Sequence, residues 1–246
     1  GTVADGAAKP KLIYTMPTFH NPTGATMSGP RRADLVALAG RHGVPILEDD
    51  YAGDLRYEGR AHPSLKAIDP GGRVINTGTF AKMLMPGLRI GFLVAEGPVY
   101  QHLAGLKRAH DLATANLVQR ALEAYLTVGL YQEHLERSRR TYRKRRDAML
   151  GAIKEHLPAG TRATAPQGGL FVWVRLPEGL SATELLPQAC AAGVAFMPGT
   201  AFCAEAAEGE QYVRLNFASQ AEREIVEGVR RLGVAVARKL ASDRGQ

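Results

Sequence analysis

Lys82 is the residue of this sequence that most strongly suggests chemistry, because polar and charged residues lie close to it along the chain. It ends the run Thr79-Phe80-Ala81-Lys82, and Arg89 follows seven positions later. A lysine amine becomes nucleophilic at neutral pH when it is partly desolvated or lies near positive charge, which Arg89 can supply. Arg89 can also bind a phosphate bidentately, and Thr79 can add a hydroxyl donor. Alone, Lys82 would be an ordinary surface lysine in a turn, so its interpretation depends on the residues around it.

Polar residues also follow three apolar runs at the points where the predicted strands end. The runs lead to Asn21-Pro22-Thr23-Gly24, to Asp49-Asp50-Tyr51 and to Thr77-Gly78-Thr79. Ligands of open parallel sheets bind in the crevice beyond the carboxyl ends of the strands, so we expect these groups to face one ligand. Side-chain alternation places Asp49 and Tyr51 on one face and Asp50 on the other. This arrangement disfavours a metal site built from both aspartates, because a hard cation needs converging oxygens.

An amine, an anion site and an isolated carboxylate are together what an aldehyde cofactor with a phosphate group requires. Asp49 beside Tyr51 can hold a protonated ring nitrogen and a neighbouring ring oxygen, while Lys82 forms a Schiff base with the aldehyde. The competing interpretation of Thr79–Lys82 as an S-x-x-K motif needs a serine nucleophile and a later S-D-N or K-T-G, which the sequence lacks. We therefore interpret Lys82 as a Schiff-base lysine.

Short apolar runs alternate with longer helical periods, which is typical of an α/β fold with a parallel sheet. Pro30 in a first turn and Gly43 as a stop signal frame the first predicted helix. The predicted strands cover residues 12–16, 44–48, 73–77, 88–94, 169–176 and 212–217. The predicted helices cover residues 30–42, 98–128, 130–157, 182–192 and 220–240. The change of character after Gly97 indicates a second, smaller α+β part.

Length and composition are those of an ordinary globular protein with one large domain or one and a half. The chain has 246 residues, of which 45% are hydrophobic. No apolar stretch approaches eighteen residues, and the first residues do not resemble a signal peptide. Cys190 and Cys203 lack metal-ligand spacing, so we expect buried, unreactive thiols, no zinc, a reducing compartment and a cytoplasmic location.

The formal charge of +7 raises the question of a nucleic-acid partner. Much of this charge lies between Arg137 and Arg146, within one predicted helix. Leu135, Tyr142 and Met149 recur there at helical spacing, so most of the charges should face solvent. No aromatic interleaving accompanies them. We favour a solvated helix face over a phosphate or partner surface.

Taken together, the motifs make the sequence resemble the fold type I, class I/II aminotransferases that depend on pyridoxal 5′-phosphate (PLP), from the first strand to the last helix. The matching motifs are Asn21-Pro22-Thr23-Gly24, Glu48-Asp49-Asp50-Tyr51, Thr79-Phe80-Ala81-Lys82, Leu88-Arg89-Ile90-Gly91, Pro198-Gly199-Thr200-Ala201-Phe202 and Tyr212-Val213-Arg214-Leu215-Asn216-Phe217. The resemblance implies part of a mostly parallel large domain over residues 1–140 and a C-terminal α+β small domain over residues 141–246.

The resemblance also implies a role for each site residue. Lys82 would form the internal aldimine with PLP and then move the substrate's α-proton. Asp49 would pair with the pyridine N–H, and Arg214 would clamp the substrate α-carboxylate. The other implied cofactor contacts are Asn21 and Tyr51 on the phenolic oxygen, and Thr79 and Arg89 on the phosphate.

Two departures from the family pattern affect what the chain is expected to do. The family has a large N-terminal portion ahead of the asparagine motif, so the resemblance implies that this chain is a fragment of a longer protein. The short spacing Asp49-x-Tyr51, with the run from Asp54 to Arg60, is similar to MocR-type regulators. Those regulators carry a GntR-like winged helix-turn-helix before an aminotransferase-like domain. The intact asparagine motif is equally typical of 2-aminoadipate-type aminotransferases.

The sequence therefore predicts a PLP-dependent aminotransferase domain that transfers an amino group between an amino acid and a 2-oxo acid. The alternative is a ligand-sensing effector domain of a MocR/GntR-type regulator with little or no turnover. The expected partners are these substrates and a second copy of the chain in a homodimer, with DNA only if a winged helix-turn-helix precedes the chain, and no membrane. A third possibility is that the fragment folds poorly, because a truncated sheet exposes strand edges.

Overall fold

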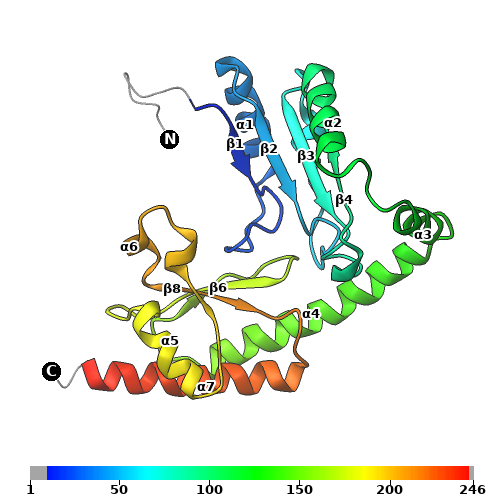
Figure 1. The fold of residues 1–246 in the computed structure, drawn as a ribbon. Coiled ribbons are helices and arrows are strands. Elements are labelled where there is room, and N and C mark those ends of the chain that lie inside the picture. The colour runs from blue at the N-terminus through cyan, green and yellow to red at the C-terminus, as the bar shows by residue number, and fades with distance from the viewer. Residues whose placement is uncertain (1–9, 244–246) are drawn as a thin grey trace. The chain divides into compact units, whose positions relative to one another are not determined.

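The computed structural model describes residues 10–243, which form two compact units. The first unit comprises residues 10–18, 26–54 and 60–136, and the second comprises residues 19–25, 55–59 and 137–243 (Figure 1). Two short segments that follow strands of the first unit thus belong to the second. The predicted domains 1–140 and 141–246 of a larger fold stay a prediction.

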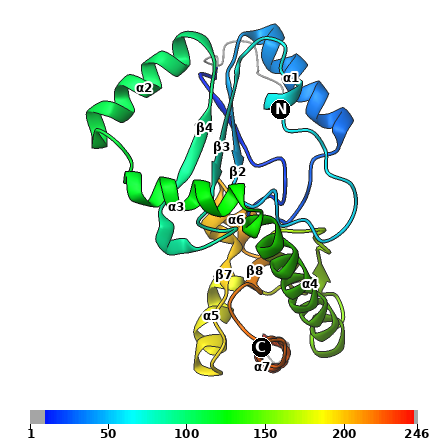
Figure 2. The same ribbon diagram turned by 90° about the vertical axis from the view of Figure 1, so that its right-hand side faces the viewer.

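A four-stranded sheet forms the centre of the first unit, in the order β1-β2-β3-β4. Its strands are β1 (Ile13–Thr15), β2 (Ile46–Asp50), β3 (Val74–Thr79) and β4 (Gly91–Val94). The first three are parallel, and β4 runs antiparallel to β3. Figure 2 shows α1 (Gly29–His42) on one side of this sheet and α2 (Gly97–Asp111) on the other. The arrangement confirms the predicted α/β class and the mostly parallel sheet.

Helix α1 begins and ends as its sequence predicts. Pro30 lies in its first turn, where a missing N–H costs nothing, and Gly43 ends it in the left-handed conformation at φ 61°. Val36 and Ala39 are buried against Ile46, and the same small core is completed by Leu65 and Val74. Burying a large aliphatic side chain contributes about 1.5–3 kcal/mol, so each of these residues helps to hold α1 against the sheet.

The predicted helix over residues 98–128 is wrong, because two helices occupy this region. Helix α2 ends at Asp111, and α3 (Asn116–Thr127) follows. Leu112 adopts φ 57°, a left-handed conformation that ends α2, and the Gln119 side chain donates to Thr114 O at 2.8 Å just beyond the break. The break contains neither glycine nor proline, so the sequence gives no stop signal there.

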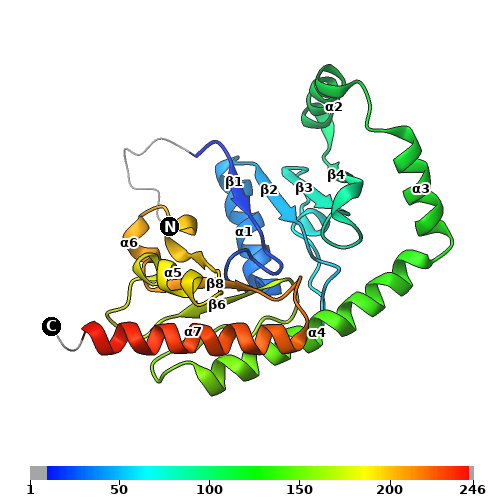
Figure 3. The same cartoon turned by 60° about the horizontal axis from the view of Figure 1, so that its bottom comes forward.

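The second unit contains an antiparallel sheet in the order β5-β6-β8-β7, covered by helices (Figure 3). Its strands are β5 (Arg162–Ala163), β6 (Phe171–Arg175), β7 (Met197–Pro198) and β8 (Tyr212–Asn216). Its helices are most of α4 (Leu130–His156), α5 (Ala182–Ala191), α6 (Ala206–Gly209) and α7 (Glu222–Asp243). One continuous core joins both central strands to α4, α5 and α7, with Val172, Val213, Leu185 and Leu232 fully buried.

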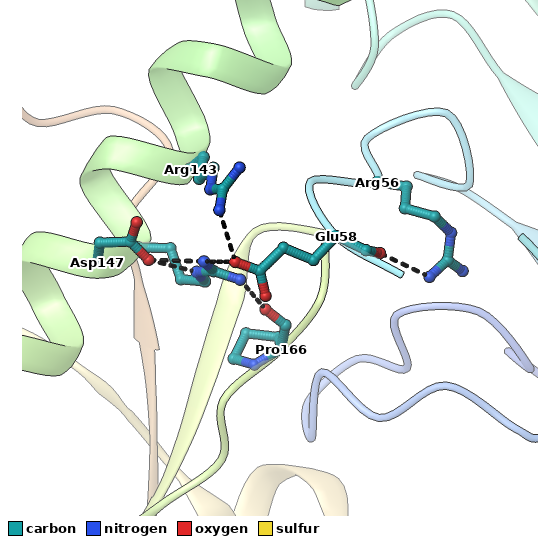
Figure 4. Close-up of polar contacts among 6 residues, drawn as sticks. Arg56, Glu58, Arg143, Asp147 and Pro166 are labelled. Atoms are coloured by element: carbon teal, nitrogen blue, oxygen red, sulfur yellow. Dashed lines mark hydrogen bonds and ion pairs between the residues drawn. The ribbon is translucent and has the colours of Figure 1, made fainter. Parts of the chain in front are cut away.

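The basic part of α4 only partly follows the prediction of a solvated face. Leu135 and Met149 are buried and Arg143 is exposed, as expected. Arg146, in contrast, is only 4% exposed and donates to Glu58 Oε1, to Asp147 Oδ1 and to Pro166 O at 2.6–2.8 Å (Figure 4). The hydrogen bond from Arg146, followed by the charges of Arg146 and Arg143, lowers the pKa of Glu58. A buried arginine keeps its charge, so it requires such partners.

Two further sequence expectations have clear outcomes. Cys190 is exposed and Cys203 is half-buried, so the expectation that both are buried is wrong. Cys190 directly follows buried Ala189 on α5 but is itself exposed. Within residues 10–243, no helix combines the length and the apolar character needed to cross a bilayer.

Candidate active site

The carboxyl ends of β2 and β3 bring two of the predicted polar groups to the same edge of the first unit's sheet. Asp49 pairs in register with Thr77, and Asp50 pairs with Gly78. Thr79, the last residue of β3, pairs with Gly91 at the start of β4. The parallel register therefore places the end of β2 beside the end of β3, as the sequence predicted.

Asp49 has a hydrogen-bond partner that the sequence analysis missed. Tyr14 on β1 donates its hydroxyl to Asp49 Oδ2 at 2.6 Å. Burial raises the pKa of Tyr14 to about 12, helped by the hydrogen bond to Asp49 and by its charge, so the phenol keeps its proton at neutral pH. One carboxylate oxygen of Asp49 is thus held, and the other can accept a further donor.

Asp50 has different neighbours from Asp49. Its Oδ1 is buried and has no hydrogen-bond partner among the described residues. Burial raises the pKa of Asp50 to about 6, with a contribution from the charges of Glu48 and Asp54, against the opposing effects of Arg32 and the Gly53 N–H. A Cβ atom at Gly53 would lie 2.3 Å from Asp50 Oδ1, so any larger residue there would displace the Asp50 carboxylate. No group of three potential metal ligands gathers within the described residues.

Lys82 projects from a tightly bonded loop after β3. It is exposed, whereas its neighbours Ala81 and Met83 are each only 6% exposed. Thr79 Oγ1 donates to Ile90 O at 3.3 Å and accepts from Ala81 N at 3.1 Å, and Phe80 N donates to Ile90 O at 3.0 Å. These bonds fix the backbone before the lysine and leave its amine at the surface.

Arg89 and Tyr51 complete the predicted set in the first unit. Arg89 follows a 3-10 helix at Pro86–Leu88 and adopts φ 51°. It directly precedes Ile90, whose carbonyl accepts the hydrogen bonds of the Lys82 loop. Arg89 is exposed, and its guanidinium donates from Nη1 to Pro86 O over a long distance of 3.5 Å. Tyr51 follows β2 and is half-buried.

Asn21 and Arg214 belong to the second unit and are bonded to each other. Arg214 on β8 donates from Nη1 to Asn21 Oδ1 at 2.8 Å. Its guanidinium carbon lies 4.2 Å from the centroid of the Phe171 ring and 4.8 Å from that of Phe202. Two aromatic faces therefore hold this cation in one orientation. The peptide bond between Asn21 and Pro22 is cis.

The chemistry of the donor set in the first unit fits PLP. An exposed primary amine can join the aldehyde carbon, a carboxylate with one oxygen already held can accept the pyridine N–H, and an exposed guanidinium can bind the phosphate. The residues that supply these groups are Lys82, Asp49 and Arg89. Thr79 already uses its hydroxyl within the loop, so its hydroxyl would have to leave Ile90 O to donate to a phosphate.

Comparison with known proteins shows which family the chain belongs to. The family model of aminotransferase class I and II matches residues 3–232, and the chain belongs to this PLP-dependent family. The chain is 42% identical over 228 residues to aromatic-amino-acid aminotransferase 1 of Thermococcus litoralis, covering 93% of this chain and 54% of that protein. It therefore spans about half the length of this relative.

Two further similarities bear on function. The crystal structure of LysN, the α-aminoadipate aminotransferase of Thermus thermophilus, complexed with N-(5′-phosphopyridoxyl)-L-leucine, superposes with a TM-score of 0.89 at 39% identity, covering 97% of this chain and 61% of that one. The HTH-type transcriptional regulator TauR of Rhodobacter capsulatus is 35% identical over 231 residues, covering 93% of this chain and 47% of that protein. The family thus contains both enzymes and a regulator among the chain's relatives.

Proposed function

We propose that this chain is the cofactor-binding and substrate-binding part of a PLP-dependent aminotransferase, which moves an amino group between an amino acid and a 2-oxo acid. The observation that carries the proposal is the register of β2 and β3, which places Asp49 beside the strand that leads into the exposed Lys82. Bound PLP would supply an electron-withdrawing ring that stabilises negative charge at the substrate's α-carbon.

Each residue of the first unit would perform one task. The Lys82 amine would hold the cofactor covalently in the resting protein and carry the substrate's α-proton during turnover. Asp49 would keep the pyridine nitrogen protonated, with Tyr14 holding its second oxygen in place. Tyr51 would donate to the ring's phenolic oxygen. Arg89, with Thr79, would bind the phosphate.

Arg214 and Asn21 would act on the substrate and on the ring. The Phe171 and Phe202 faces orient the Arg214 guanidinium before any ligand arrives, so its planar fork is prepared for the substrate's α-carboxylate. Because Asn21 Oδ1 accepts from Arg214, its amide N–H remains available to donate to the phenolic oxygen.

The resemblance to the family supports three finer proposals. The protein would act as a homodimer in the cytoplasm, and residues 1–140 and 141–246 would form the end of the large domain and the small domain. The 35% identity to the regulator TauR supports a second candidate function: a ligand-sensing domain of a MocR/GntR-type regulator that binds the same cofactor with little or no turnover.

A spectroscopic cycle separates the two functions. PLP is added to the purified protein, and the visible band of the covalently bound cofactor is followed through a panel of L-amino acids and then a 2-oxo acid. A band that is lost with an amino acid and returns with a 2-oxo acid is the expected result. A band that forms and never cycles would contradict the enzyme and favour the sensor. The variant Arg214→Lys separates substrate binding from cofactor binding. It should raise the amino-acid concentration needed for half-bleaching and leave the initial band intact.

A further inference from the structure

The loop that carries Lys82 is contacted by the first turns of α4. The Tyr131 ring meets the Phe80 ring edge-on, with centroids 5.7 Å apart and 70° between the planes. Its hydroxyl donates to Asp54 Oδ2 at 2.9 Å and lies 3.8 Å from Met83 Sδ. Three residues further along α4, His134 Nε2 lies 3.0 Å from Met83 O. Residues three apart share a helix face, so one face of α4 contacts the loop on both sides of the lysine.

The two contact points are themselves well anchored. Phe80 packs against the Phe92 ring on β4, with centroids 5.9 Å apart, and its carbonyl accepts from the N–H groups of Leu84 and Met85 at 2.9 and 3.3 Å. Met83 is buried, and Leu135, beside His134 on α4, is 2% exposed. The lysine therefore projects from a short backbone segment whose flanking residues are both fixed.

We propose that Tyr131 and His134 are positioning residues for Lys82. Tyr131 packs against the Phe80 ring and His134 contacts Met83 O, and together they hold the loop so that the amine at the tip of a flexible side chain samples a small volume beyond β3. The inference rests on the proposed function, because it concerns condensation of the Lys82 amine with the cofactor's aldehyde, which forms a C=N bond and releases the aldehyde oxygen as water. A misplacement of about 1 Å can cost about a hundredfold in such a step.

Variants at these positions remove the contacts one at a time. Tyr131→Phe keeps the ring against Phe80 and loses the hydroxyl, whereas Tyr131→Ala loses both. His134→Ala removes the contact with Met83 O, and His134→Gln restores an N–H donor of similar reach. Gln132→Ala is the matched control, since Gln132 is exposed on the same turn of α4.

The first readout is the rate at which the cofactor attaches. PLP is added to cofactor-free protein, samples are quenched with borohydride at intervals, and the modified fraction of the Lys82 peptide is measured by mass spectrometry. Attachment should slow about tenfold or more in Tyr131→Ala and about threefold in His134→Ala, following the cost of misplaced reactive groups. His134→Gln should recover most of the rate, and Gln132→Ala should match the wild type.

The second readout needs no cofactor. Hydrogen exchange at the Leu84 and Met85 amides, which are bonded to Phe80 O, should accelerate in Tyr131→Ala, while the amides of β6 in the second unit stay as slow as in the wild type. A general loss of folding would instead accelerate both sets. If Tyr131→Ala does not fold, Tyr131→Phe and His134→Ala carry the same test.

The outcomes separate this inference from the proposed function. A wild-type chain whose Lys82 is never modified overturns the proposed function and the inference with it. Modification of the wild type, with unchanged rates and unchanged exchange in Tyr131→Ala and His134→Ala, overturns the inference alone. Slower attachment together with faster exchange confined to the loop supports it.

Discussion

The two units differ in how completely they bury their apolar residues. In the second unit, β6 and β8 each alternate between half-buried and buried positions before an exposed last residue, and helices cover the buried face. In the first unit, every residue of β4 is exposed, including Phe92 and Leu93, and α2 has no buried residue. Large exposed apolar surface in a soluble protein marks a site of contact with another segment or chain. The unit that carries Lys82 and Asp49 is therefore the less self-sufficient of the two.

The largest expected difference concerns the same substitution made in each unit. Leu232→Ala, at a fully buried position on α7, should lower the free energy of unfolding by about 2–5 kcal/mol. Leu93→Ala, at a position on β4 that is 42% exposed, should change it by about 0.5 kcal/mol or less. Urea denaturation followed by circular dichroism measures both. Equal losses would contradict the comparison, since they would mean that β4 is as well packed as α7.

A pH-dependent effect is expected within the first unit. Because burial raises the pKa of Asp50 to about 6 from an ordinary value of 3.8, the folded state favours the protonated form. The contribution of Asp50 protonation to the free energy of unfolding is fully present below pH 3.8, and it is lost as the pH rises through 6. The difference between the raised and the ordinary pKa of Asp50 corresponds to at most about 3 kcal/mol of unfolding free energy.

Asp50→Asn isolates this contribution, because its amide stays neutral at every pH. The variant should gain stability relative to the wild type on going from pH 4 to pH 7.5, measured by urea denaturation at each pH. Asp69→Asn is a control at another carboxylate of the first unit, which bonds Val74 N and Gly71 N instead. Parallel curves for Asp50→Asn and the wild type would contradict a raised pKa at this site.

How much of this organisation could be predicted from sequence depends on the range of the interaction involved. The two ends of α1 are determined by neighbouring residues, Pro30 and Gly43, and both ends were predicted. The contact between Tyr14 and Asp49 joins residues 35 positions apart and depends on the register of β1 and β2, which no local pattern reveals. The break after α2 has no glycine or proline to announce it.

The candidate site shows the same distinction. Asp49 lies at the end of β2, Lys82 follows β3 and Arg89 precedes β4, so their types and spacings could be interpreted directly. Tyr131 and His134 reach the Lys82 loop from a helix about 50 residues further along the chain, and nothing in their own surroundings marks them. Most of the basic residues between Arg137 and Arg146 were expected to face solvent, and nothing in the sequence singled out Arg146 as the one that Glu58 and Asp147 stabilise in the interior.

The smallest expected effect concerns the support of Asp49. Tyr14→Phe removes the hydrogen bond to Oδ2 and should weaken PLP binding about fivefold, in line with about 1 kcal/mol for one hydrogen bond. Fluorescence titration of the cofactor measures the change. Tyr100→Phe, at an exposed tyrosine on α2, should leave the affinity unchanged. Equal affinities for Tyr14→Phe and the wild type would show that the hydrogen bond does not support the ring.

The most direct test of the central claim is where the cofactor attaches. Wild type, Lys82→Ala and Lys107→Ala are each incubated with PLP, reduced with borohydride and analysed by peptide mass spectrometry. Lys107 is an exposed lysine on α2 paired with Asp111, so it controls for non-specific reaction of surface amines. A pyridoxyl adduct on the Lys82 peptide of the wild type and of Lys107→Ala, and none on Lys82→Ala, is the result predicted here. An adduct of equal yield that persists in Lys82→Ala would contradict the assignment of Lys82.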